Sequence, residues 1–417
     1  MSDDASHNIL VLGASGLIGR YLTDDLRARG FHAIGIARQF TAAQKMSAAD
    51  LELPLMSMDV ADLTQLLRTH EVNVVVNCLG VLQDGPGSDT SAVHRDFVAR
   101  LLEAIRDSHR AIRLVHISIP GSADQDRTAF SATKRKAERL IAASGIAHAI
   151  LRPGFVIAPS AYGGSAMLRA LAALPVDLPA DEAATPFQPV AVEDIAATIA
   201  WLATRDIDDE AVRSVTWDLM QKQPVSLGGV IAQFRWSFGT AKQFRIASPS
   251  FLIDLGARLG DLTNRLGWMP PMRSTAIAEL RRGVTGDPSP WMHATGIVPK
   301  TIAQAVGGRP ATIQDKWFAR LFLIKALIFA SLVLFWVASG FIALVISYDA
   351  AAGILSAHHF PPALVGPVTV GTSLMDMSIG VLIAIRRAAA FGLVAGIVAS
   401  LGYMFGSAIL TDRKSVV

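Results

Sequence analysis

The stretch HNILVLGASGLIG at residues 7–19 constrains the fold more than any other part of the chain. An apolar run rich in branched side chains breaks at Gly13, and a helix-like pattern resumes after Gly19. In a dinucleotide-binding unit with this glycine spacing, Gly13 permits a tight turn, Gly16 lets the backbone approach a pyrophosphate, and Gly19 lets helix and strand pack closely. The alternative is a turn without a ligand. We predict cofactor contacts from Gly13, Ser15, Gly16, Leu17, Ile18 and Gly19.

The residue that follows the second predicted strand bears on the choice of cofactor. That strand covers residues 31–37, and Arg38 comes directly after it. An NAD-type site usually places a carboxylate there for the ribose 2′-hydroxyl, whereas a cation suits a 2′-phosphate. We therefore expect NADP(H) rather than NAD(H), the alternative being that Arg38 is a solvated surface residue.

Strands and helices alternate through the first half of the chain. Further strands are predicted at residues 56–60, 72–78, 112–118 and 147–152, with helical segments between them. This alternation is typical of the α/β class, specifically a Rossmann-like, doubly wound parallel sheet, whose ligands bind at the carboxyl ends of the strands. Residues predicted at these ends are Gly13, Arg38, Asp59, Gly80, Ser118 and Pro153.

These features together resemble the short-chain dehydrogenase/reductase superfamily, in particular its atypical and extended members. The resemblance is carried by the glycine motif, Asp59, residues 77–80, Ser118, and residues 152–154 and 192–196. It implies that Asp59 contacts the adenine, that Gly80 lines the dinucleotide cleft and that Pro153 lies near the nicotinamide. The domain also resembles the accessory subunit of respiratory complex I that keeps bound NADPH as a structural element.

The resemblance implies a catalytic Tyr followed four residues later by Lys, but Phe130 and Lys134 occupy these positions here. A phenyl ring cannot act as a general acid or base, a contribution of about 10²–10⁴-fold in rate. Lys134 can still bind ribose hydroxyls, and it remains a weak catalytic candidate together with Ser118. Ser118 has the alternative of capping local backbone. Tyr162 is a less favoured substitute proton donor.

Residues 215–316 are predicted to form a mixed cap or connecting segment between a Rossmann domain at residues 1–214 and a membrane domain at residues 317–417. Apolar residues recur at helical spacing from Phe251 to Leu266, and Gly267 ends this amphipathic stretch. It is interpreted as a core-facing helix or, alternatively, as a helix that lies on the membrane surface or against the spanning helices, where Arg258 and Arg265 would meet lipid headgroups. No metal-ligand cluster is expected, since His358 and His359 are adjacent and other histidines are scattered.

The composition indicates a membrane-embedded part. The chain is 51% hydrophobic and 18% charged, with a mean hydropathy of +0.40. Three spans, predicted at residues 322–348, 364–385 and 388–411, form a C-terminal transmembrane helical bundle. The net charge of +3 is too small to indicate nucleic acid, the single Cys78 excludes a disulfide framework, and no secretory signal precedes the first strand.

Cations predict how the spans are oriented. Arg320, Lys325 and the pair Arg386–Arg387 flank the spans on one side, whereas the loop at residues 349–363 has no Lys or Arg. The positive-inside rule places the nucleotide-binding domain in the cytoplasm, at a bacterial inner membrane. The tail resembles the DoxX-like membrane domain, which usually has four spans, so we expect a shortened or altered C-terminus. Asp376, near mid-membrane, is either a packing residue or involved in proton or quinone handling.

The leading hypothesis is a membrane-anchored NADP(H)-binding protein of atypical short-chain dehydrogenase type, with membrane lipid as a partner. In it the cofactor is structural, sensory or used on an unidentified membrane-linked substrate. One alternative is a reductase or isomerase acting on a lipid or quinone. Another is a non-enzymatic assembly or scaffold subunit of a respiratory complex.

Overall fold

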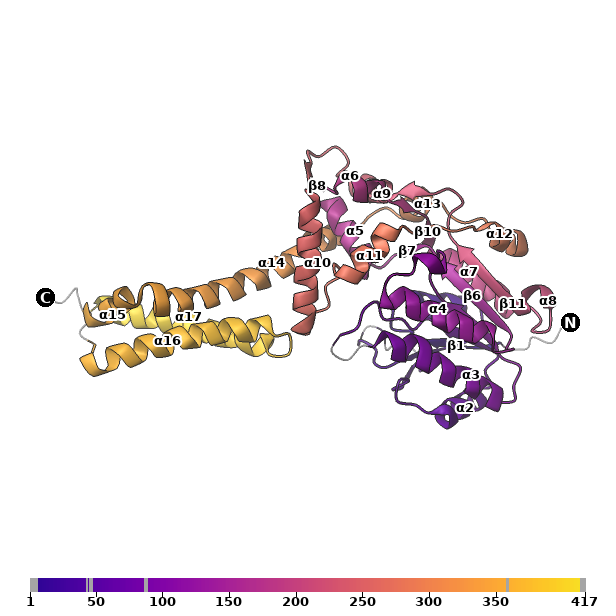
Figure 1. Ribbon diagram of the computed structural model, residues 1–417, viewed down its shortest axis with the longest axis horizontal. Coiled ribbons are helices and arrows are strands. Elements are labelled where there is room, and N and C mark those ends of the chain that lie inside the picture. Colours follow the sequence, from indigo (N-terminus) through magenta and orange to yellow (C-terminus); the bar gives the residue numbers. More distant parts are fainter. Residues whose placement is uncertain (1–6, 43, 45–47, 86–88, 358–359, 413–417) are drawn as a thin grey trace. The chain divides into compact units, whose positions relative to one another are not determined.

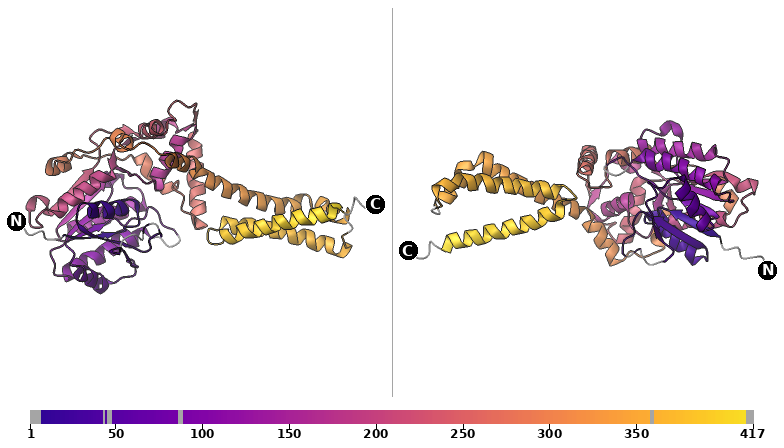
Figure 2. Two further views of the ribbon diagram at one scale, coloured as in Figure 1. Left: turned by 180° about the vertical axis from the view of Figure 1, so that it is seen from behind. Right: turned by 90° about the horizontal axis from the view of Figure 1, so that it is seen from below.

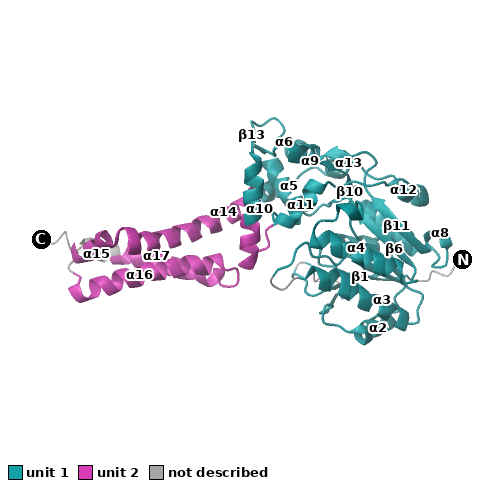
Figure 3. Cartoon of the chain, in the orientation of Figure 1, with its two compact units in different colours: residues 1–258, 271–319 teal, residues 259–270, 320–417 magenta. Residues whose placement is uncertain are grey.

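The chain forms two compact units, which Figure 3 distinguishes by colour. One unit contains residues 1–258 and 271–319, and the other contains residues 259–270 and 320–417. This computed structural model describes residues 7–42, 44, 48–85, 89–357 and 360–412, with side-chain surroundings to residue 406. The predicted histidine pair, His358 and His359, lies outside the described residues, as do Arg413 and Lys414 beyond the last predicted span.

A seven-stranded parallel sheet forms the centre of the first unit, with the order β11-β6-β5-β4-β1-β2-β3 (Figure 1). This order and the all-parallel pairing confirm the predicted Rossmann-like fold. The strands are β1 (Asn8–Leu12), β2 (His32–Ala37), β3 (Leu51–Glu52), β4 (Val74–Asn77), β5 (Arg113–Ile117), β6 (His148–Pro153) and β11 (Ser214–Leu219).

Helices cover both faces of the sheet, so its central strands are apolar on both sides. In β1, Ile9 and Val11 join one core with α1 and α7, whereas Leu10 and Leu12 join the other core with α2, α3 and α4. Successive side chains of a strand point to opposite faces, which explains the continuous apolar run at the start of the chain. The helices are α1 (Leu17–Ala28), α2 (Val60–Thr69), α3 (Phe97–Asp107), α4 (Ala129–Ala142) and α7 (Val192–Ala203).

The predicted strand at residues 56–60 is wrong. Strand β3 ends at Glu52, and Asp59 instead begins α2 as its N-cap. The Asp59 carboxylate accepts a hydrogen bond from the Asp62 backbone at 2.8 Å, while the Asp62 carboxylate accepts one from the Asp59 backbone at 3.3 Å. Aspartate is a preferred N-cap, because its oxygen satisfies an N–H group that the helix leaves free.

Strand β11 crosses the boundary predicted at residue 214. It pairs with β6 from Ser214↔His148 to Leu219↔Pro153, so the sheet continues five residues into the segment predicted as mixed. The alternation signal fades there because β11 follows the short helix α8 (Glu210–Arg213) and alternates exposed with buried residues, unlike the central strands.

The rest of the first unit is a smaller lobe of helices and two-stranded sheets. Its apolar core draws on α5, α9 and α13 and includes Leu168, Phe234 and Val306. Strand pairs β7–β10, β8–β13 and β9–β12 border it. Its elements are β7 (Phe155–Ile157), α5 (Gly163–Ala173), β8 (Val176–Asp177), α6 (Ala180–Ala184), β9 (Pro186–Phe187), β10 (Pro189–Ala191), β12 (Val225–Ser226), α9 (Leu227–Phe238), β13 (Ile246–Ala247), α11 (Ser274–Arg282), α12 (Ser289–Thr295) and α13 (Ile302–Gly307).

Three helices are long and apolar enough to cross a membrane, within the part of the chain that the structure describes. They are Ile313–Ile346, Pro362–Ala384 and Ala389–Gly406, so three transmembrane-capable segments are confirmed. The first comprises α14 (Ile313–Phe341) and the π-helical turn Ile342–Ile346, and begins before the predicted residue 322. The others belong to α16 (Pro362–Ala384) and α17 (Ala389–Asp412), seen in two further views in Figure 2.

The segment predicted as a loop at residues 349–363 contains a helix, α15 (Tyr348–Ala357). A tight turn that contains Arg386 and Arg387 joins the last two spans, because α16 ends at Ala384 and α17 begins at Ala389. Apolar helix formers between Tyr348 and Ala357 allow α15 to form without a charged face.

Some of the glycines in the apolar helices allow close packing between them. A Cβ at Gly392 would lie 2.7 Å from the backbone nitrogen of Ile383, and one at Gly396 would touch Trp336 at 3.2 Å. Gly402 has no heavy atom within 4 Å of such a Cβ among the described residues. Gly380 makes a close approach between α16 and α14, at 2.6 Å from Val337.

Asp376 has a hydrogen-bond partner inside the helical unit. The hydroxyl of Tyr403 on α17 donates to its Oδ1 at 2.7 Å, and Ser339 on α14 supplies a second side-chain hydrogen bond. Asp376 is buried, as are Ser373 and Thr369 on the preceding turns of α16. Hydrogen-bonded polar groups between apolar helices are an established means of helix association. The contacts match the packing alternative for Asp376.

Replacing Gly19 by Ala should destabilise the Rossmann domain. The added Cβ would lie 2.3 Å from the carbonyl oxygen of Gly13 and 2.8 Å from its carbon, so the turn or α1 must shift. Overpacking of this kind costs about 1–3 kcal/mol. Thermal unfolding of the nucleotide-free protein in detergent, followed by circular dichroism, should show the loss. Gly16→Ala is the matched control, because its Cβ would lie 3.3 Å from that oxygen. Equal midpoints for both variants would contradict the packing role.

Candidate nucleotide-binding site

The glycine loop is held in the turn that the sequence predicts. Gly13 has φ of +83°, a conformation that side chains disfavour. The backbone N–H groups of Gly13 and Ala14 both donate to the carbonyl of Ile36 in β2, at 2.8 and 2.9 Å. These bonds fix the loop to the neighbouring strand. A Cβ on Gly13 would lie 3.3 Å from the carbonyl carbon of Cys78, so the turn also lies close to the end of β4.

The N-terminus of α1 has the properties of an anion site. Gly16 is its N-cap, and no side chain caps the first turn. By contrast, Asp59 caps α2 and Thr128 caps α4. Uncapped N–H groups and the positive end of the helix dipole favour a phosphate. Leu17 and Ile18 stand in this first turn.

A cation and a carboxylate lie at the ends of the neighbouring strands β2 and β3. Arg38 is exposed directly after the strand, where the sequence predicts a 2′-phosphate contact. Glu52, at the end of the neighbouring β3, accepts a hydrogen bond from the backbone of Phe40 at 2.8 Å. Gln44 links this loop to the glycine loop by donating to the carbonyl of Ser15 at 3.2 Å. Sequence reasoning missed Glu52, because β3 is displaced from its predicted position.

Lys134 lies buried between two strand ends. Its ammonium donates to the carbonyls of Leu79 at 3.2 Å and Ile117 at 2.9 Å, and it lies 3.7 Å from where a Gly80 Cβ would stand. Burial lowers the pKa of Lys134 to about 8. The predicted residues Gly80, Ser118 and Lys134 are therefore brought together at the carboxyl edge of the sheet.

The ring of Phe130 packs edge-on against His94, with ring centroids 5.6 Å apart. His94 accepts a hydrogen bond at Nε2 from the Val81 backbone at 3.1 Å, so its proton is on Nδ1, which faces the Thr133 hydroxyl at 2.8 Å. Burial, with the charge of Lys134, lowers the pKa of His94 to about 3. His94 is therefore a neutral, fully hydrogen-bonded ring and does not replace the missing tyrosine hydroxyl.

The hydroxyl of Ser118 is engaged by a buried carboxylate. It donates to Oε1 of Glu138 at 2.5 Å. Arg152 binds the same carboxylate with two hydrogen bonds, at 2.9 and 2.6 Å, and Arg135 contacts both of its oxygens at 3.0 and 3.1 Å. Although burial raises the pKa of Glu138, hydrogen bonds from Arg152 and Ser118 and the arginine charges hold it below its usual value.

The charge network extends to α11. Asp126 binds Arg135 at 3.0 Å and Arg282 at 2.8 Å, and Arg282 also pairs with Glu279 at 3.0 Å. Glu279 accepts a further hydrogen bond from Thr128, the N-cap of α4. These contacts tie α11 to the N-terminal end of α4. The spacing of residues 130, 134 and 138 places them on one face of α4, where Lys134 and Glu138 are buried, but no sequence pattern indicates the contacts with α11.

The remaining predicted residues lie in different settings. Pro153 is buried at the end of β6, where it pairs with Leu219 of β11. Tyr162 is 65% exposed immediately before α5, and Asp59 is exposed at the start of α2. Among the described residues, no group of three or more His, Cys, Asp or Glu side chains could hold a metal.

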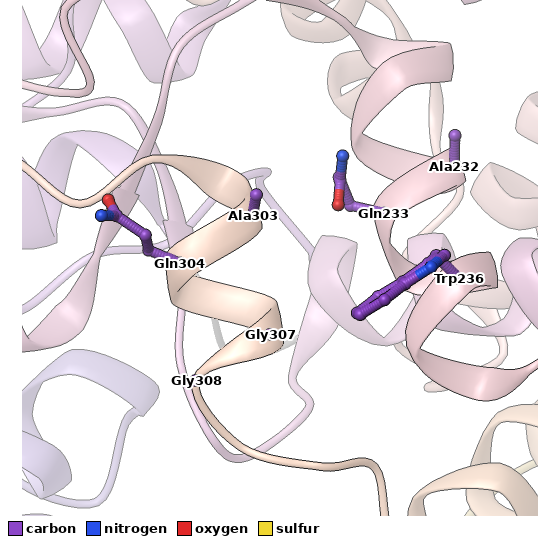
Figure 4. Close-up of a pocket in the computed structure, with 7 residues that line it drawn as sticks. All are labelled: Ala232, Gln233, Trp236, Ala303, Gln304, Gly307 and Gly308. Carbon is purple, nitrogen blue, oxygen red and sulfur yellow. The ribbon is translucent and has the colours of Figure 1, made fainter.

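An open groove of about 720 Å³ lies between α9 and α13 (Figure 4). Its lining is formed by Ala232, Gln233, Trp236, Ala303, Gln304, Gly307 and Gly308. None of these residues belongs to the glycine loop or the surroundings of Lys134. The groove is thus a separate feature from the nucleotide-binding edge of the sheet.

Two parts of the chain match known families. Residues 9–205 match the NAD dependent epimerase/dehydratase family, and residues 333–414 match the DoxX-like family. A dTDP-6-deoxy-L-talose 4-dehydrogenase (NAD(P)(+)) of Kitasatospora kifunensis is 30% identical over 27% of this chain. A 3-diazoavenalumate denitrifying reductase of a Streptomyces species is 31% identical over 39% of it. The chain spans 35% and 62% of the length of these two relatives.

Solved structures show the same fold. The UDP-glucuronic acid 4-epimerase of Bacillus cereus has a TM-score of 0.55 at 14% identity, covering 76% of this chain and 99% of its own. The UDP-glucose 4-epimerase of Thermotoga maritima has a TM-score of 0.53 at 14% identity, covering 72% and 97%. At this identity the likeness shows the fold alone.

The fold and the glycine loop define a Rossmann-type protein with transmembrane-capable helices. More particularly, the chain combines a Rossmann domain, similar to the NAD dependent epimerase/dehydratase family over residues 9–205, with a C-terminal part that is similar to the DoxX-like family over residues 333–414 and contains transmembrane-capable helices. Nicotinamide-dinucleotide binding is supported by that family match.

Dinucleotide affinity should fall as pH rises through about 8. The Lys134 pKa is lowered from 10.5 to about 8, so its ammonium, the form that would donate to ribose hydroxyls in the role that the resemblance implies, is lost above that pH. NADPH is titrated into the detergent-purified protein at a series of pH values. Above pH 8 the affinity should fall by at most roughly tenfold for each pH unit. Lys134→Met should bind weakly without this dependence, and Lys136→Met, exposed on the same helix, should retain it. A flat wild-type profile would contradict the role.

Proposed function

We propose that this chain is a membrane-anchored NADP(H)-binding protein in which the dinucleotide serves as a structural or sensory ligand. The observation that carries the proposal is the environment of Lys134. Its ammonium stands at the carboxyl edge of the sheet beside Gly80, while the position four residues earlier on α4 holds Phe130. Lys134 and Gly80, which suit dinucleotide binding, are present, whereas the tyrosine hydroxyl that the family resemblance implies as proton donor is replaced by the ring of Phe130.

The surroundings of Phe130 support this proposal. His94 has both ring nitrogens engaged, and the Ser118 hydroxyl donates to Glu138. A general acid must present its proton to the substrate within hydrogen-bond reach. The nearby hydroxyl and imidazole groups instead hold the protein together: the bond of Ser118 to the charged Glu138 contributes about 1.5–3 kcal/mol, and each neutral bond of His94 about 0.5–1.5 kcal/mol.

The preference for NADP(H) rests on Arg38. Its exposed side chain follows β2, and a guanidinium can bind a 2′-phosphate through two hydrogen bonds. The neighbouring Glu52 carboxylate is already hydrogen-bonded to the backbone of Phe40. This assignment gives Arg38 the role that a carboxylate has in NAD-type sites.

Purification in detergent followed by release and identification of the bound nucleotide tests the proposal directly. NADP(H) should be retained or should bind on titration. Arg38→Ala should weaken NADPH binding by about 10–100-fold, the value of a lost charged hydrogen bond, and leave NADH within about twofold. Arg29→Ala, which removes the exposed ion pair with Asp25, is the matched control. Absence of any nicotinamide dinucleotide would reject the proposal, and equal losses for NADPH and NADH would reject the role of Arg38.

Restoring the hydroxyl distinguishes a binding protein from an active reductase. We expect the wild type to oxidise no NADPH with a small quinone or aldehyde. Phe130→Tyr should gain measurable carbonyl reduction, because general acid catalysis supplies about 10²–10⁴-fold. Phe130→Leu should show no such reduction. The loss of NADPH absorbance measures the reaction in each variant.

The second candidate function is a reductase or isomerase acting on a lipid or quinone, with Ser118, Lys134 and Tyr162 in substitute roles. It is favoured by the names of the relatives, which are a dehydrogenase and a reductase, and by the pKa of about 8 for Lys134, which suits proton transfer near neutral pH. Wild-type turnover that Lys134→Ala abolishes would support this candidate against the first.

We further propose a bacterial inner membrane location, with the nucleotide-binding domain in the cytoplasm. Arg386 and Arg387 are exposed in the turn between α16 and α17, and Arg320 and Lys325 lie on α14. The positive-inside rule places these cations on the cytoplasmic side. An assembly role in a respiratory complex is the non-enzymatic form of this proposal, and co-purification of complex subunits tests it.

A further inference from the structure

Helix α10 (Ser250–Arg265) buries the face that carries its small residues and exposes the face that carries its large apolar residues. Ala257, Gly260 and Asn264 recur at intervals of three and four, and all are buried. The opposite arrangement is expected of a core-facing helix, which buries its leucines. The core-facing interpretation of this stretch is therefore wrong.

The exposed side of α10 is a continuous apolar stripe. Its members are spaced so that they share one helix face. They are Phe251 (62% exposed), Leu252 (45%), Leu255 (47%), Leu259 (52%) and Leu262 (53%). Arg258 and Arg265 are also exposed and recur at an interval of seven, which places them along one side of the stripe. This pattern of leucines bordered by cations is typical of helices that lie in a membrane surface.

The residues that follow α10 hold it to one end of the apolar helices. Within the second unit, the indole of Trp268 donates to the carbonyl of Ala384, the last residue of α16, at 2.7 Å. The same indole packs against Phe329 of α14, with centroids 4.8 Å apart. The Arg386 backbone donates to Leu266 at 3.1 Å, and its guanidinium to Gly267 at 3.3 Å.

These contacts fix the depth of the helix terminus. Arg386 and Arg387 are exposed charges between two apolar spans, so they mark the level at which the bilayer meets water. Trp268 is bonded at this level, and tryptophan is enriched there. The C-terminal end of α10, two residues before Gly267, is therefore held at the level of these two arginines.

We propose that α10 is an interfacial helix whose apolar stripe is covered by the bilayer, at the boundary of lipid headgroups and acyl chains. The occupant is lipid because the stripe continues from a terminus that is bonded to the end of a span, and because Arg258 and Arg265 border it where anionic headgroups would lie. The proposal goes beyond nucleotide binding and is independent of it. It gives the chain a membrane contact in addition to its spans.

Nitroxide labelling of the full chain tests the proposal. Single cysteines replace Leu252 or Leu259 in a Cys78→Ser background, and the labelled protein is reconstituted in phosphatidylethanolamine–phosphatidylglycerol vesicles. Power-saturation electron paramagnetic resonance then compares collisions with oxygen, which concentrates in lipid, and with a nickel chelate, which stays in water. Both labels should favour oxygen. Val398→Cys, on the exposed face of α17, provides the lipid reference.

Asp254→Cys is the matched control on the same helix. Its carboxylate is 51% exposed and pairs with Arg281 on the side of α10 that carries Arg258 and Arg265 rather than within the stripe, so its label should favour the nickel chelate more than the labels at Leu252 and Leu259 do. Nickel accessibility at Leu252 and Leu259 equal to that at Asp254 would overturn the proposal. Low accessibility to both reagents at the stripe would also overturn it, because a second copy or another protein would then cover the helix. Neither result depends on whether nucleotide binds.

Discussion

The burial of two opposite charges on one face of α4 is the constraint around which the candidate site is built. Lys134 reaches the ends of β4 and β5, and Glu138, one turn later, receives Ser118 and two arginines. Buried charges are costly unless they are paired and hydrogen-bonded. The ends of the strands at which a dinucleotide would bind are thus held by polar contacts that need no ligand.

The sequence predicts those parts of the fold whose signals are local. The glycine turn follows from residues 7–19, and the parallel sheet from apolar runs buried on both faces. Asp59 was misplaced in a strand because its neighbours are apolar, although its acidic partner Asp62 is three residues on and forms a capping box. Strand β11 was assigned to the mixed segment because it alternates exposed and buried residues, which weakens the signal of a buried strand.

The candidate site depends on contacts between residues far apart in the chain, and these were not predicted. The spacing to Lys134 is enough to place Phe130 at the position of the expected tyrosine. The pairing of Ser118 with Glu138, however, depends on β5 packing beside α4, which local spacing does not indicate. Likewise, periodicity identified the apolar stripe of α10 but not which face is covered. A helix with two unlike faces buries the one that fits its neighbour, and Ala257 and Gly260 permit a closer approach than leucines do.

Binding and catalysis are separable in this arrangement. The pyrophosphate end of a dinucleotide would be held by backbone N–H groups at the start of α1, which depend on Gly13, Gly16 and Gly19 rather than on any side chain. Proton transfer depends on a hydroxyl at position 130, and a single ring substitution removes it without touching the glycine loop. Since Lys134 is also bonded to two strand ends, its retention is explained by the fold alone. The presence of Lys134 therefore does not by itself decide between binding and turnover, whereas the hydroxyl that Phe130 lacks is the group on which that choice depends.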